Sequence, residues 1–118
     1  MNHPNAPTKP IGIGILSCAV AGLLFATGTA VSAPLFPKGD PAKGAALHKS
    51  KCVSCHNSMM PNGKGEELYS EDFRKMKSAS ELRTMVEFCA NRTRSGWFDE
   101  EIDHVSRYLN DQHYKFKK

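Results

Sequence analysis

The feature that most constrains this chain is the pentapeptide Cys-Val-Ser-Cys-His at residues 52–56. Two thiols at this spacing on a helical turn can form thioether bonds to the two vinyl groups of one porphyrin. The adjacent imidazole then lies beneath the porphyrin iron, and its other ring nitrogen must donate a hydrogen bond that fixes its orientation. The motif therefore predicts one covalently attached haem c, bound by Cys52 and Cys55, with His56 as the proximal iron ligand.

Two other chemistries use a pair of cysteines at this spacing. A redox-active dithiol usually lies between a strand and a helix of a β-α-β unit, and no strand pattern precedes Cys52. A zinc site needs a second close pair of Cys or His, which Cys89 and His104 do not provide. The residue pattern therefore favours haem.

Residues 1–33 have the composition of a secretory signal peptide. A polar start that carries Lys9 is followed by residues 11–30 without a charged side chain and then by small residues. A retained membrane anchor is the alternative, because twenty largely apolar residues can span a bilayer. Either arrangement places residues 34–118 outside the cytoplasmic membrane, and we expect them in the periplasm.

The part of the chain after this signal is small. About 85 residues form one domain, too short for a two-domain enzyme, and an apolar core of that size gives marginal stability by itself. We therefore expect a cofactor to complete the core.

Helical patterns occupy both ends of this part. Asp40 is a good N-cap for a helix over Pro41–Lys49, in which Gly44 permits the close approach of a second helix. Residues 98–112 begin with acidic side chains, which the helix dipole favours, and carry an apolar stripe. We expect the two helices to cross where Tyr108 meets Gly44.

A third helix of about ten residues is predicted after Ser78, which forms a capping-box pattern with Glu81. Residues 57–77 contain Pro and Gly and indicate a loop with one helical turn near residues 70–74. No alternating apolar segment is long enough for a strand, so the predicted fold is all-α.

Residues 39–44, the motif at 52–56 and the segment 99–109 together resemble a class I cytochrome c. The resemblance covers most of residues 34–118 and implies a cytochrome c domain of three to four helices around one covalent haem. It also implies an electron carrier that passes single electrons between redox partners. The sequence shows no acid–base pair, nucleophile motif or substrate-pocket pattern, so we expect no enzymatic activity.

The sixth iron ligand is where the sequence departs from that family. Electron-carrying members usually have a methionine just before the last helix, and residues 90–97 contain none. Met76 is the preferred candidate, because it is an apolar residue in a basic segment and is far enough from the motif to reach the other haem face. Met85, His104, Asn91 and an open position are the alternatives.

Other candidate residues are assigned structural roles. Met59 and Met60 follow the motif too closely to reach the opposite haem face, and we expect them to cover the haem edge. His48 and His113 are expected to face solvent. Cys89 is expected to be a small apolar residue packed in its helix, with an intermolecular disulfide as the alternative.

A fainter resemblance links residues 85–109 to the oxygen-binding sphaeroides haem protein group, through Cys89 and Leu109. In that group an asparagine before this cysteine binds iron reversibly, but Phe88 stands there in this chain. Two alternative functions stay open, and the missing methionine favours the first of them. One is a haem protein whose open or displaceable distal site binds oxygen or nitric oxide, and the other is the haem subunit of a larger oxidoreductase.

The charge of residues 34–118 limits the kinds of partner that this chain can bind. From Pro34 onward there are 15 Lys and Arg against 12 Asp and Glu, a net charge too small to indicate nucleic-acid binding. Arg92, Arg94 and the tail at 115–118 could form a basic rim that steers an acidic redox partner, and simple solvation of these side chains is the alternative. Contact with a membrane is expected only if the N-terminal segment is retained.

Overall fold

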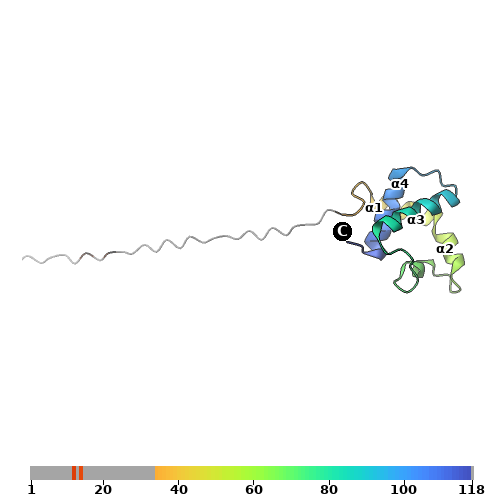
Figure 1. Cartoon of the computed structure of the whole chain (residues 1–118), viewed down its shortest axis with the longest axis horizontal. Coiled ribbons are helices and arrows are strands. Elements are labelled where there is room, and N and C mark those ends of the chain that lie inside the picture. The colour runs from red at the N-terminus through yellow and green to blue at the C-terminus, as the bar shows by residue number, and fades with distance from the viewer. Residues whose placement is uncertain (1–11, 13, 15–33, 118) are drawn as a thin grey trace, which may run out of the picture. The chain divides into compact units, whose positions relative to one another are not determined.

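The computed structural model describes Gly12, Gly14 and residues 34–117, so almost all of the predicted signal segment lies outside the described residues. The chain divides after Ala30 into two units, and the second contains every described helix. The elements in order are α1 (Pro41–Lys51), α2 (Val53–Met59), the 3₁₀ helix η1 (Gly65–Tyr69), α3 (Ala79–Arg92), α4 (Asp99–Leu109) and the π-helical turn η2 (Asn110–Tyr114) (Figure 1). No strand occurs in this described part, which confirms the all-α prediction. Its helices are all too short or too polar to cross a membrane.

The start of α1 follows from the sequence. The Asp40 carboxylate accepts hydrogen bonds from the backbone N–H groups of Lys43 (3.1 Å) and Ala42 (2.8 Å), while Pro41 occupies the first helical position. These two bonds lower the pKa of Asp40, because they stabilise the ionised cap. The helix runs to Lys51, slightly beyond its predicted end.

Helices α1 and α4 pack directly on each other (Figure 1). A Cβ atom at Gly44 would lie 2.8 Å from the Cβ of Tyr108 and would overlap the backbone carbonyl of His104. The predicted crossing of Gly44 and Tyr108 is thus confirmed, and the absence of a side chain at Gly44 sets the distance between the two backbones.

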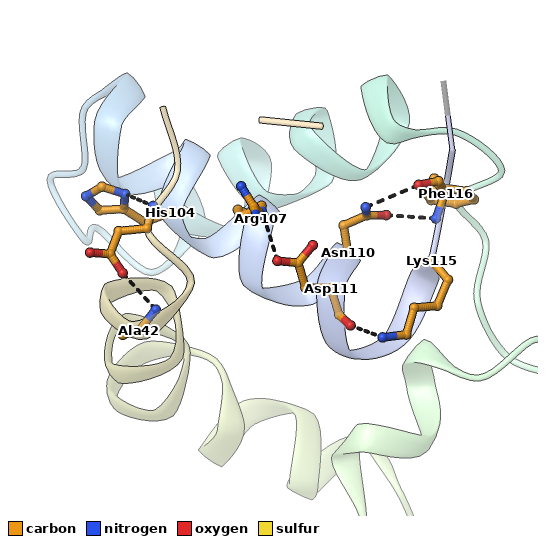
Figure 2. A network of polar contacts seen from close by, with 8 residues as sticks. Ala42, His104, Arg107, Asn110, Asp111, Lys115 and Phe116 are labelled. Carbon is orange, nitrogen blue, oxygen red and sulfur yellow. Dashed lines mark hydrogen bonds and ion pairs between the residues drawn. The ribbon is translucent and has the colours of Figure 1, made fainter. Parts of the chain in front are cut away.

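His104 adds a polar link at the same crossing. Its ring is buried, and its Nδ1 accepts a hydrogen bond of 2.8 Å from the backbone N–H of Asp40 (Figure 2). The other ring nitrogen faces the Glu100 carboxylate at 3.5 Å. His104 therefore joins the start of α1 to α4.

Helix α4 continues into η2, where the chain turns back on itself. The buried side-chain amide of Asn110 accepts a hydrogen bond from the backbone N–H of Phe116 (2.9 Å) and donates one to its carbonyl (3.3 Å) (Figure 2). Lys115 at the bend has a positive φ of 56°. This turn directs Tyr114 inward, where its side chain is almost fully buried.

The capping box of α3 forms with one change. The Ser78 hydroxyl accepts from the N–H of Glu81 (3.2 Å), as predicted, but the Glu81 carboxylate accepts from Lys77 (2.7 Å) instead of Ser78. Arg83 then joins α3 to α4 by donating to Asp103 at 2.7 Å and Asp99 at 3.0 Å.

The segment between α2 and α3 contains more helix than predicted. The expected turn is present, because the carbonyl of Ser70 accepts from the N–H groups of Phe73 and Arg74. The preceding η1 was not predicted, since Gly65 and Pro61 indicate a loop.

We predict that Gly44→Ala destabilises the folded protein by about 1–3 kcal/mol, because the new methyl group meets backbone atoms of α4 that cannot rotate away. Thermal unfolding followed by circular dichroism measures this. Lys43→Ala is the matched control at an exposed neighbour and should change stability by less than about 0.5 kcal/mol. Equal effects of the two substitutions would show that the crossing is not tight.

Candidate functional site

A mostly apolar cavity of about 460 Å³ lies between the motif and the helices α3 and α4. Its volume is in the range typical of cofactor pockets. Leu82 and Val86 of α3 and Val105 and Leu109 of α4 form part of its wall, and all four belong to the core. The cavity is therefore continuous with the hydrophobic interior.

All three chemically distinctive motif residues line this cavity. Cys52 lies at the junction of α1 and α2, and Cys55 and His56 follow on α2, so the motif does occupy a helical turn. Burial raises the pKa of the Cys52 thiol to about 11, which keeps it protonated at neutral pH. A redox-active dithiol needs the opposite shift, so the electrostatics disfavour that alternative.

The His56 ring is held by a hydrogen bond. Its Nδ1 lies 2.5 Å from the hydroxyl of Tyr69, the last residue of η1. Burial lowers the pKa of His56, which favours the neutral ring that a metal ligand requires. With Nδ1 engaged in this way, Nε2 is the nitrogen that can bind iron.

Gly65 brings Tyr69 to this position. The N–H of Gly65 donates to the Asn57 side chain at 2.9 Å, and a Cβ atom at Gly65 would lie only 2.7 Å from the Cβ of His56. The start of η1 therefore lies directly on α2, which it could not do with a larger residue.

Two of the methionines considered as ligands lie at the cavity. Met76 is partly buried, packs against the core and lines the wall, which fits the predicted inward orientation, and Met85 also lines it. Met59 lines it from an exposed position, whereas Met60 is not part of the wall.

The other ligand alternatives do not fit. His104 is outside the cavity wall, and its ring is bonded to the backbone of Asp40 instead. Asn91 is exposed on α3 and is also outside the wall. The structure therefore places neither where it could bind iron in this cavity.

The expectation that His48 and His113 face solvent is wrong. The His48 side chain is only 8% exposed, and its Nε2 lies 2.6 Å from the Tyr69 hydroxyl. His113 is half-buried, with its ring centroid 4.8 Å from that of Tyr69. Both rings pack around a tyrosine whose position the helical pattern does not reveal.

Cys89 is half-buried on α3 and lines the cavity, in keeping with a packed apolar role. Its Sγ lies 3.9 Å from the Met85 sulfur, and burial raises the pKa of its thiol. No disulfide forms between the cysteines that the structure describes.

Tyr114 provides a test of whether a haem fits this cavity. Its side chain is 3% exposed and lines the wall, but its hydroxyl has no hydrogen-bond partner among the described residues. Burial raises the pKa of this hydroxyl to about 12, so it remains a donor. An unpaired buried hydroxyl is costly, and a cofactor with polar groups would relieve that cost. The two cysteines and the histidine of the motif, together with the unpaired hydroxyl of Tyr114, thus fit a haem.

Sequence reasoning missed Tyr69 and Tyr114. Each is a single aromatic residue outside the three predicted helices, and no spacing rule connects either of them to the motif. Their roles depend on η1 and η2, the two short elements that the sequence pattern does not reveal.

The cavity has a basic and partly apolar border. Lys51, Lys75 and Arg92 line it, together with the exposed rings of Phe73 and Phe88. Arg92, one of the basic residues predicted to form a rim, lies at the cavity.

Residues 115–117 of the C-terminal tail do not line the cavity. Phe116 lies against Arg74, whose guanidinium carbon is 5.4 Å from the centroid of the phenyl ring. Lys118 lies outside the described residues.

No family model matches this chain, and no solved structure matches it. A short stretch is similar to cytochrome c of Theileria annulata, with 75% identity over 20 residues. This stretch is 17% of the chain and 17% of that protein. The match supports a cytochrome c-like relationship only over this short segment, and the class I assignment remains a prediction.

We predict that Tyr114→Phe destabilises protein purified with haem by about 1 kcal/mol, because a cofactor in the cavity would give this hydroxyl a hydrogen-bond partner. Unfolding by guanidinium chloride measures the change. Ser106→Ala is the matched control, since Ser106 also has a buried hydroxyl without a described partner but does not line the cavity. Removal of the Ser106 hydroxyl should leave the free energy of unfolding unchanged or increase it. If Tyr114→Phe behaves in the same way, Tyr114 makes no bond to the cofactor.

Proposed function

We propose that this chain is an exported, periplasmic haem c protein that carries single electrons between redox partners, with residues 1–33 as its signal peptide. The observation that carries the proposal is that Cys52, Cys55 and His56 line one apolar cavity, with Nδ1 of His56 already hydrogen-bonded. The short likeness to a cytochrome c supports the part of this proposal that concerns a haem electron carrier.

Different residues are assigned different roles in binding the cofactor. Cys52 and Cys55 would hold the haem through thioether bonds, Nε2 of His56 would bind the iron, and Met76 is the proposed sixth ligand. The bound haem supplies reversible one-electron exchange between ferric and ferrous iron. The core residues Leu82 and Val105 exclude water from the site, which helps to set the potential. In this proposal the chain is a carrier and not an enzyme.

The border of the cavity fits an acidic redox partner. Lys51, Lys75 and Arg92 place positive charge beside the exposed rings of Phe73 and Phe88. Such charges increase the rate of encounter with an acidic protein at low ionic strength.

A haem protein with an open distal site is the second candidate. Residues 90–97 contain no methionine, and Trp97 lines the cavity there. Oxygen or nitric oxide would be the ligand of such a site.

Optical spectra separate the two candidates. If Met76 binds the iron, the ferric protein shows the far-red charge-transfer band of methionine ligation, and Met76→Leu abolishes it. Met85→Leu is the matched control, because this methionine also lines the cavity, and it should retain the band. A native protein that lacks the band and binds carbon monoxide at once when reduced would contradict the Met76 assignment and favour the second candidate.

We predict that Lys75→Glu slows electron transfer to a purified acidic redox protein by up to about tenfold at low ionic strength, and that high salt removes the difference. Stopped-flow absorbance measures the rate. Lys43→Glu makes the same charge change at an exposed site on α1 outside the cavity border, and it should have a smaller effect. Equal rates for both variants would mean that the border residues are only solvated side chains.

A further inference from the structure

Three side chains on three different elements form a short hydrogen-bonded chain on one side of the cavity. The Tyr69 hydroxyl lies 2.5 Å from Nδ1 of His56 and 2.6 Å from Nε2 of His48. Tyr69 belongs to η1, His56 to α2 and His48 to α1. The motif predicts a hydrogen bond from the ring of His56, but it does not identify Tyr69 or His48 as members of the network.

Two of these three side chains are buried, and the ring of the central tyrosine is held on several sides. Tyr69 is 5% exposed and His48 is 8% exposed. The ring centroid of Tyr69 lies 4.8 Å from that of His113 and 6.0 Å from that of Tyr114. The hydroxyl of Tyr69 is therefore fixed between the two histidines by packing as well as by hydrogen bonds.

The protons along this chain can be arranged in one consistent way when iron is bound. A His56 ring that binds iron through Nε2 keeps its proton on Nδ1 and donates it to the Tyr69 oxygen. The single hydroxyl proton of Tyr69 is then donated to Nε2 of His48. His48 must be a neutral acceptor for this, and burial lowers its pKa to about 4.

We propose that Tyr69 is a positioning residue that orients His56 and lowers the reduction potential of the iron, and that His48 acts through Tyr69. This inference rests on the proposed haem function. A hydrogen bond donated from Nδ1 increases the electron density of the imidazole, which stabilises ferric iron more than ferrous iron. The bond from Tyr69 to His48 polarises the hydroxyl oxygen and makes it a better acceptor.

The test uses the exported, haem-loaded protein produced from the whole sequence. Tyr69→Phe should raise the midpoint potential, because Nδ1–H of His56 loses its acceptor. His48→Leu should raise it less, and His48→Gln should restore part of the shift by returning an acceptor. Because His48 acts through Tyr69, the Tyr69→Phe/His48→Leu double variant should have the potential of Tyr69→Phe alone.

A second measurement reports on the hydrogen bond itself. In protein with ¹⁵N-labelled histidine, the Nδ1 proton of His56 should exchange with solvent faster in Tyr69→Phe than in the native protein. Tyr108→Phe is the matched control: its ring centroid lies 5.3 Å from that of His48, and no hydrogen bond to its hydroxyl occurs among the described contacts. It should change neither the potential nor the exchange.

The outcomes separate this inference from the proposed function. If haem-loaded Tyr69→Phe keeps both the native potential and the native exchange rate, the positioning role is wrong while the haem function stands. If the double variant shifts the midpoint potential by the sum of the Tyr69→Phe and His48→Leu shifts, His48 does not act through Tyr69. A native chain that never acquires haem contradicts the proposed function and this inference with it.

Discussion

The close packing of α1 on α4 is the constraint on which the site depends. Gly44 lets the two backbones approach, and His104 bonds the start of α1 to the other helix. The motif begins where α1 ends, while Val105 and Leu109 of α4 form part of the cavity wall. One helix crossing thus places the two thiols and the imidazole opposite an apolar surface, and a cofactor attached there would complete a core that is otherwise small.

The side of the cavity that holds His56 depends on a second close approach. Gly65 lets η1 lie on α2, and this places the hydroxyl of Tyr69 between His56 and His48. The same tyrosine packs against His113 from the turn that follows α4. The geometry of the proposed iron ligand therefore depends on contacts from both ends of the folded part, and the helix crossing holds those ends together.

Features with a local sequence signal were predicted correctly. The cap at Asp40 and the helix after Ser78 depend on residue types at fixed spacing. The crossing of α1 and α4 joins residues far apart in the chain, but Gly44 gives it a local signal, because a glycine inside a helix permits the close approach of a second helix. The burial of His48 and the role of Tyr114 were not predicted, because each depends on contacts between residues far apart in the chain. Periodicity shows which face of a helix is apolar, but it does not show which polar side chains meet inside the fold.

The central claim is that Cys52 and Cys55 hold one haem covalently, and the intact mass of the exported protein tests it most directly. Protein produced with the c-type cytochrome maturation system should be red, and its mass after denaturation should exceed that of the polypeptide by one haem. The Cys52→Ala/Cys55→Ala variant should lose this increment. Colourless native protein with the mass of the polypeptide alone would contradict the account.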